Sequence, residues 1–184
     1  MPSLADLLPS STWEKLGVNP YFTNHYWTHA EETYNKLKTR KEEDFCSDDA
    51  SYAIKVLERY YKAIIQLAHE NDDHYRMPYI KNENSDKKGK YLVEYTHGLS
   101  VLRKEIVKNF PECFPMLSRS DEDILSKNLN RFQRLYVDAS YNEFVSYSTF
   151  KEILEFIEKE RAMMEDFLNS KPFSKDKDKE SEYI

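Results

Sequence analysis

Apolar residues recur every third or fourth position along most of the chain, which is the spacing that places them on one face of an α-helix. The repeats predict helices at about residues 23–40, 48–70 and 91–109, from Ser120 onward, and at about 148–169. The second of these has the widest apolar stripe, so we expect it to be the most buried. The pattern predicts an all-α, up-and-down bundle of about five helices.

Polar residues and prolines mark the ends of these helices. Ser-Asp-Asp at residues 47–49 can cap the second helix, and Ser120 with the acidic residues after it can open the fourth. Pro111 and Pro115 stop the third helix. Residues 71–90 are polar and contain a proline, so we expect a long loop there.

The chain of 184 residues suits one domain with a hydrophobic core. Residues 1–22 are rich in proline and predict an irregular N-terminal lead-in. Residues 23–170 predict the bundle. Residues 171–184 alternate lysine with acidic residues, so we expect a disordered charged tail.

Composition narrows the classes of function. Three glycines argue against a turn-rich β fold and against a glycine-rich phosphate loop. The net charge of −6 shows no broad nucleic-acid footprint, although a local basic groove is compatible with it. The sequence contains no run of 18 apolar residues, which a membrane-spanning helix would need. Cys46 and Cys113 have no metal-ligand or disulfide spacing, which favours a cytoplasmic protein.

The junction between the last two predicted helices carries the first candidate chemistry. It contains Arg131, Arg134, Tyr136 and Tyr141 but no histidine. With Tyr61, these side chains could line a groove in which aromatic faces and guanidinium groups hold a nucleotide or a single strand. The other interpretation is that the tyrosines are half-buried helix residues whose hydroxyls reach water.

Other polar residues each have a structural and a functional interpretation. Glu58 and Lys62 stand four apart, as in a surface ion pair, or form a polar spot in a dimer groove. His97 either packs at a helix start or contacts a ligand. His25 and His29 share a helical face, but no carboxylate has the spacing of a zinc motif. We expect no metal site and no cofactor.

Three short motifs suggest a family. The second helix reads Glu-Arg-Tyr-Tyr-Lys-Ala over residues 58–63, and the third reads Thr-His-Gly-Leu over residues 96–99 with Leu102 after it. Leu-Tyr-Val-Asp occupies residues 135–138. In this order, over about residues 24–170, the motifs resemble the HEPN family of helical-bundle proteins. The resemblance implies a homodimer formed through bundle faces.

The chain departs from the ribonuclease-type members of that family. Those members resemble one another in an arginine followed four to six residues later by a histidine, whereas Arg134 is followed over that distance by residues up to Ser140, with Tyr141 one position further, and none of them is a histidine. RNA cleavage needs a group that exchanges a proton near neutral pH, which a phenol with a pKa of about 10 does poorly. Leu135 also replaces the arginine of the family's Arg-Tyr pair. Arg134 could therefore bind a phosphate without cutting.

The sequence thus predicts a non-catalytic binding or regulatory module that contacts a protein partner, a nucleotide or RNA, as a homodimer without membrane contact. Two alternatives stay open. One is a ribonuclease of the toxin or defence type, in which Arg134 holds the phosphate and Tyr141 or His97 replaces the missing histidine. The other is an interaction scaffold, for example the companion of a nucleotidyltransferase.

Overall fold

Helices make up most of the computed structural model, which describes residues 20–68, 79–81, 90–92, 97–140 and 144–170. Its five α-helices are α3 (Pro20–Lys38), α4 (Ser47–Ala68), α5 (Leu99–Asn109), α6 (Arg119–Ser140) and α7 (Tyr147–Ser170). A short 3-10 helix, η1 (Glu42–Asp44), joins α3 to α4, and β1 (Tyr79–Lys81) pairs antiparallel with β2 (Lys90–Leu92). The predicted all-α bundle is confirmed, with this small hairpin added.

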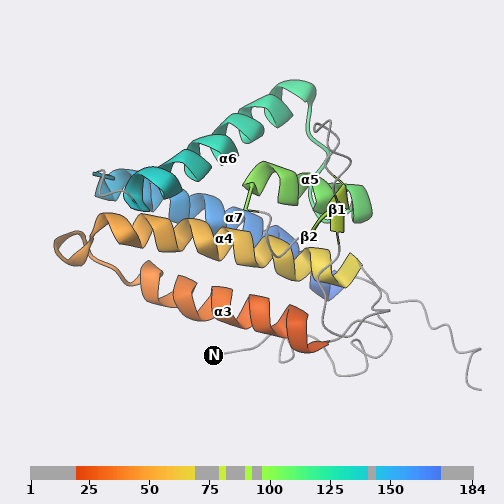
Figure 1. Cartoon of the computed structure of the whole chain (residues 1–184), viewed down its shortest axis with the longest axis horizontal. Helices are drawn as coiled ribbons and strands as arrows, with labels where there is room; N and C mark the ends of the chain where they lie inside the picture. The colour runs from red at the N-terminus through yellow and green to blue at the C-terminus, as the bar shows by residue number, and fades with distance from the viewer. Residues whose placement is uncertain (1–19, 69–78, 82–89, 93–96, 141–143, 171–184) are drawn as a thin grey trace, which may run out of the picture.

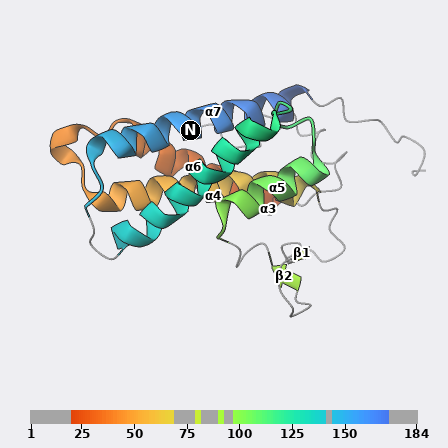
Figure 2. The ribbon, with the colours of Figure 1, turned by 90° about the horizontal axis from the view of Figure 1, so that it is seen from above.

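Helix α4 lies at the centre of the bundle and packs against each of the other four helices. Figures 1 and 2 show α3, α4 and α7 side by side along the long axis, while α6 crosses them obliquely. Ten apolar residues of α4 are buried, as its wide stripe predicts: Ala50, Ala53, Ile54, Val56, Leu57, Tyr60, Tyr61, Ala63, Ile64 and Ile65.

Short polar side chains fix the first turns of three helices. The N–H of Cys46 donates to Asp49 Oδ2 at 3.1 Å, so a carboxylate inside α4 caps the residue before it. Ser118 Oγ accepts the N–H of Asp121 at 3.2 Å, and Ser146 Oγ accepts that of Thr149 at the same distance. Ser118, rather than the predicted Ser120, therefore opens α6.

The third helix begins later than predicted. The periodicity placed its start near Tyr91, but residues 90–92 form β2, and α5 begins at Leu99, after Gly98. The single loop predicted over residues 71–90 is wrong in part, because β1 lies within it. Each strand contains one aromatic and one aliphatic residue, and these pair across the two strands, Tyr79 with Leu92 and Ile80 with Tyr91.

The predicted N-terminal boundary of the bundle, at residue 23, is three residues too late. Helix α3 begins at Pro20, so residues 20–22 belong to the bundle and not to the predicted lead-in. A proline is well tolerated at the first helical position, where its missing N–H has no partner to lose. Residues 1–19 and the predicted charged tail lie outside the described residues. None of the described helices is long and apolar enough to cross a membrane.

Candidate ligand-binding site

A buried carboxylate, Glu58 on α4, gathers polar side chains from three parts of the bundle. We call this group the Glu58 cluster, and its members are Lys55, Glu58, Lys62, His97 and Tyr136. The three α4 residues stand three and four positions apart, so they share one helical face. His97 lies two residues before α5, and Tyr136 comes from the C-terminal half of α6.

Both oxygens of Glu58 are occupied. Lys62 Nζ donates to Oε1 at 2.7 Å, and Lys55 Nζ donates to Oε2 at 2.8 Å. His97 Nδ1 lies 2.9 Å from Oε1 and 3.4 Å from Lys55 Nζ. A single carboxylate therefore positions two ammonium groups and an imidazole.

The pKa of Glu58 reflects a balance of opposing effects. Burial by itself raises the pKa of the carboxyl, since it disfavours the charged form. Hydrogen bonds from Lys55 and Lys62, the charge of Lys62 and the contact with His97 outweigh burial, so the pKa is lowered. Glu58 is ionised at neutral pH and faces the ammonium groups of both Lys55 and Lys62.

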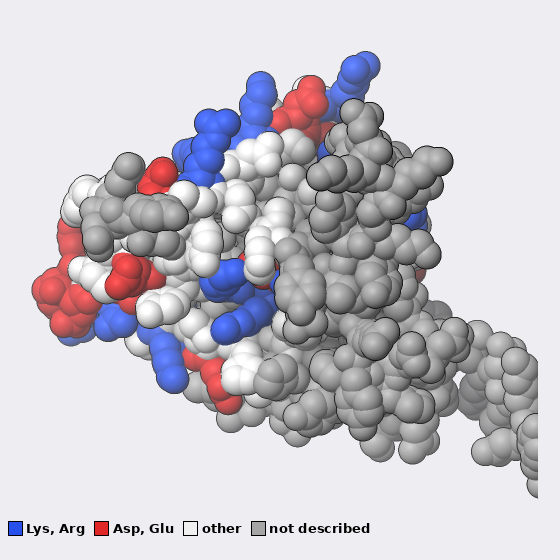
Figure 3. Space-filling view, in the orientation of Figure 1, with Lys and Arg blue, Asp and Glu red and all other residues white. Residues whose placement is uncertain are grey.

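Two of the groups that contact Glu58 reach solvent. The side chain of Lys62 is only 4% exposed, but those of Lys55 and His97 are 27% and 54% exposed. Lys55 Nζ also lies 4.8 Å from the centre of the half-buried Tyr136 ring, within the range of a cation–π contact. Figure 3 shows Lys and Arg side chains gathered near the middle of this face of the molecule and along its upper edge.

The predicted site residues divide into two groups. His97, Lys62 and Tyr136 come together in the Glu58 cluster, whereas Arg131 and Arg134 are exposed on α6. Arg131 donates from Nη2 to Glu152 of α7. Arg134 is two residues from Tyr136, a rotation of about 200° around the helix, so it faces solvent while Tyr136 faces inward. Tyr141 lies outside the described residues.

Tyr61 is a core residue and not part of a groove. It is fully buried, and its hydroxyl donates to Glu160 Oε2 of α7 at 2.8 Å. Arg103 of α5 donates from Nε to the same oxygen, also at 2.8 Å, and its guanidinium lies 3.9 Å from the Phe114 ring centre. Burial, and then the charge of Glu160, raise the pKa of Tyr61, which keeps its proton and acts as a donor.

Its neighbour Tyr60 makes a matching arrangement on the other side of α4. The Tyr60 hydroxyl donates to Glu31 of α3, and Arg161 of α7 donates from Nη2 to Glu31 Oε2 at 3.1 Å. Burial, and then the charge of Glu31, raise the pKa of Tyr60. Two adjacent tyrosines thus begin two buried Tyr–Glu–Arg networks, which tie α4 to α3, α5 and α7.

Sequence reasoning missed Lys55 and both networks. Lys55 had a usable signal, because it stands one turn before Glu58 and on the same face as Lys62. The networks had none, since Glu31, Arg103 and Glu160 are far apart in the sequence and each resembles an ordinary surface charge.

Metal ligands do not assemble in the part of the chain that the structure describes. There, no group of three or more His, Cys, Asp or Glu side chains could hold a metal ion. His29 Nδ1 lies 3.9 Å from Glu32, and the side chain of His25 is outside the described residues. No protein-family model, curated protein or solved structure matches this chain.

Proposed function

We propose that this chain is a non-catalytic binding module that holds a phosphate group of a nucleotide or RNA at the Glu58 cluster. The observation that carries the proposal is the gathering of two ammonium groups and an imidazole around one carboxylate. One carboxylate faces Lys55, Lys62 and His97, and two of these three side chains reach solvent. A phosphate would bring negative charge to the exposed Lys55 ammonium and several acceptors for charge-assisted hydrogen bonds.

Two further features support a nucleotide over a simple anion. Tyr136 places an aromatic ring beside Lys55, and a base can stack on such a ring while the ammonium binds its phosphate. The cluster also combines residues from all three motifs that resemble the HEPN family, at residues 58–63, 96–99 and 135–138. Motifs distant in sequence that meet at one point favour a shared binding role.

The test is a binding assay on matched lysine variants. Lys55→Ala should weaken binding of a fluorescent oligoribonucleotide or of a nucleotide at least tenfold, about 1.4 kcal/mol. Lys36→Ala removes an exposed lysine of α3, so it should leave the affinity unchanged. Binding should also weaken as salt rises, because phosphate contacts release counterions. An equal loss in both variants, or no binding to any nucleotide or RNA at low salt, would contradict the proposal.

One observation favours a ribonuclease as the second candidate. The contact of Glu58 with His97 Nδ1 is the arrangement by which a carboxylate orients an imidazole as a general base, with Nε2 as the reacting nitrogen. RNA incubated with the wild type, His97→Ala and Arg134→Ala decides between the two. Cleavage by the wild type that both variants lose would establish the ribonuclease; intact RNA that is nevertheless bound supports the non-catalytic module.

The homodimer that the HEPN resemblance implies is also a proposal. Two large apolar side chains, Tyr52 on α4 and Phe144 before α7, are 56% and 86% exposed. Sedimentation equilibrium over a range of concentrations should give twice the mass of the chain. A monomer mass at every concentration would contradict the dimer, and a complex formed only with a second protein would favour the scaffold.

A further inference from the structure

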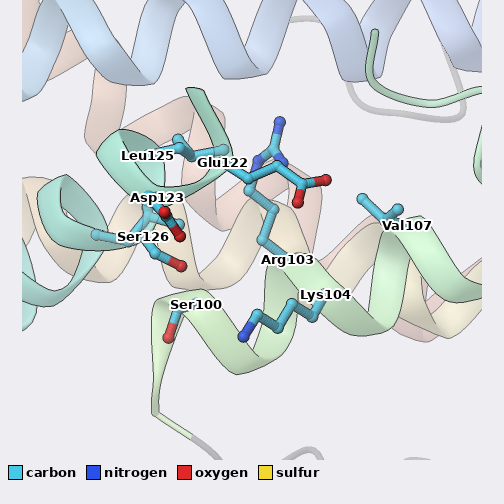
Figure 4. Close-up of a pocket in the computed structure, with 9 residues that line it drawn as sticks. Ser100, Arg103, Lys104, Val107, Glu122, Asp123, Leu125 and Ser126 are labelled. Atoms are coloured by element: carbon cyan, nitrogen blue, oxygen red, sulfur yellow. The ribbon is translucent and has the colours of Figure 1, made fainter. Parts of the chain in front are cut away.

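Two cavities share Arg103, and neither is lined by a residue of the Glu58 cluster. The first, of about 240 Å³, lies between α5 and α6 (Figure 4). The second, of about 260 Å³, lies between α6, the segment before it and α7. Arg103 and Leu125 line both cavities. Cavities of this size suit a small molecule and not a folded partner.

Arg103 is a fixed, incompletely used donor at this point. Its side chain is 9% exposed, and Glu160 and the Phe114 ring hold the guanidinium in place. Among the described residues, Glu160 is its single hydrogen-bond acceptor, and it engages only Nε. A guanidinium has further N–H groups in a planar fork that fits a carboxylate.

Charges of opposite sign line the first cavity without pairing across it. Helix α5 contributes Arg103 and Lys104, and the first turns of α6 contribute Glu122 and Asp123. Figure 4 shows Arg103 and Lys104 extending from α5 in different directions, with Asp123 on α6 across from them. No ion pair between these cations and these carboxylates occurs in the described part of the chain.

The lining therefore selects a ligand by charge. A simple anion would meet Glu122 and Asp123, and a simple cation would meet Lys104 beside the Arg103–Glu160 pair, so either would face like charge on one wall. A molecule that carries both charges satisfies both walls. Apolar side chains from both helices, Val107, Leu125 and Leu129, complete the lining and can receive an aliphatic group.

We propose that the α5–α6 cavity binds a small zwitterion with an aliphatic side chain, the chemistry of a free α-amino acid. Its carboxylate would lie toward the unused N–H groups of Arg103, with Lys104 adding positive charge to the same wall. Its ammonium would lie toward Glu122 and Asp123, and its side chain against Val107 and the leucines. The site is separate from the Glu58 cluster and does not depend on phosphate binding there.

Three probes of one shape test the charge requirement. L-leucine carries both charges, 4-methylpentanoate lacks the amine, and 3-methylbutylamine lacks the carboxylate. Isothermal titration on the whole chain should give binding of L-leucine or of another aliphatic amino acid, and binding at least tenfold weaker for both analogues. Backbone amide NMR signals of α5 and α6 should shift on titration. No binding by any aliphatic amino acid, or equal binding of all three probes, would overturn the proposal.

Variants place the ligand in the cavity. Lys104→Met and Asp123→Asn alter exposed side chains on opposite walls, so both should fold, and each should weaken amino-acid binding about tenfold. Lys36→Met and Asp166→Asn are matched controls on exposed positions of α3 and α7, outside the cavity, and should bind as the wild type does. Unchanged binding in both cavity variants would overturn the site. Phosphate binding at the Glu58 cluster should be the same in all four proteins, so the two proposals fail separately.

Discussion

Glu58 illustrates what a buried charge requires of its neighbours. Moving a carboxylate out of water costs about several kcal/mol even after the surrounding structure relaxes. Its interaction partners must recover about the same amount of free energy. Here Lys62 is buried with it, while Lys55 and His97 connect the pair to the surface. The carboxylate therefore has two functions, to neutralise Lys62 and to position two groups that a ligand can reach.

Replacing Glu58 by glutamine should destabilise the fold. Glu58→Gln keeps the size of the side chain but removes the charge that faces Lys62, so the free energy of unfolding should fall by about 3 kcal/mol. Urea unfolding of the variant and the wild type measures this difference. Glu155→Gln, at an exposed position of α7, is the control and should change little. A decrease in the free energy of unfolding no larger than that of the control would show that the charge of Glu58 does not stabilise the fold.

The same carboxylate predicts a dependence of stability on pH. The pKa of Glu58 is lower in the folded chain than its ordinary value of 4.5, so ionised Glu58 stabilises the fold above about pH 4.5. This contribution is lost as the pH falls through the lowered pKa. The stability difference between the wild type and Glu58→Gln should thus be largest near neutral pH and shrink below pH 4.5. A difference that stays constant down to pH 3, about the limit of such a titration, would contradict the ionised state of Glu58.

At the scale of a single element, the start of α4 depends on Asp49. Its carboxylate accepts the N–H of Cys46 and also pairs with Arg40 Nη2 at 3.0 Å, so it joins the cap of α4 to the segment that follows α3. Ser47 beside it accepts the N–H of Val145 at 3.1 Å, which brings the segment before α7 to the same point. One turn of helix therefore holds three segments together.

Asp49 and Asp48 form a natural matched pair. Asp49→Ala removes the cap and the ion pair of a buried carboxylate, so it should lower the free energy of unfolding by about 2 kcal/mol. Asp48→Ala removes a neighbouring, exposed carboxylate and should have a much smaller effect. Thermal or urea unfolding of the two variants gives the comparison. Equal losses would mean that only the charge near the helix start matters, through the helix dipole.

The starts of the helices differ in how well they could be predicted from the sequence. Where a serine or aspartate caps a helix, the start could be predicted to within two residues, as for α4 and α6. The start of α5 could not, because the apolar spacing through Tyr91 fits a helix as well as a strand, and pairing with residues 79–81 decides between them. Glu58 and Lys62 could be recognised as a pair, but their burial and their contact with His97 depend on packing between helices.

At the scale of the whole molecule, α4 connects the bundle, since every other helix packs on it. The two Tyr–Glu–Arg networks lie along this helix and place hydrogen-bonded charges inside a largely apolar core. Because such groups are costly when unpaired, the networks favour one relative placement of the helices over others of similar apolar contact.

Removing one hydroxyl from this system tests its contribution. Tyr61→Phe keeps the ring but takes a donor from Glu160, so the free energy of unfolding should fall by about 2 kcal/mol. The pKa of Tyr61 is raised in the fold, so its stabilising effect is complete below its ordinary value of 10.0 and is lost as the pH rises beyond it. The wild type should therefore lose more stability than Tyr61→Phe above about pH 10. Tyr52→Phe, at an exposed position of α4, should match the wild type throughout.

The central place of α4 also predicts cooperative unfolding. Leu57→Ala leaves a cavity at a fully buried position, which should cost about 3 kcal/mol. Buried Trp27 of α3 contributes to the tryptophan fluorescence. Within each protein, the fluorescence and the far-ultraviolet circular dichroism should change at one common temperature, which is lower for the variant than for the wild type. Separate transitions would show that α3 melts independently of the rest.

The adjacent residues Glu160 and Arg161 on α7 have opposite charges and contact different helices. Glu160 meets Arg103 on one side of α4, and Arg161 meets Glu31 on the other. Exchanging the two, as Glu160→Arg with Arg161→Glu, would oppose arginine to arginine and glutamate to glutamate while leaving the amino-acid composition and net charge identical. The order of these two residues therefore fixes the register of α7. A shift by one residue would bring either Arg161 against Arg103 or Glu160 against Glu31, so each misregistered packing is opposed by like charges.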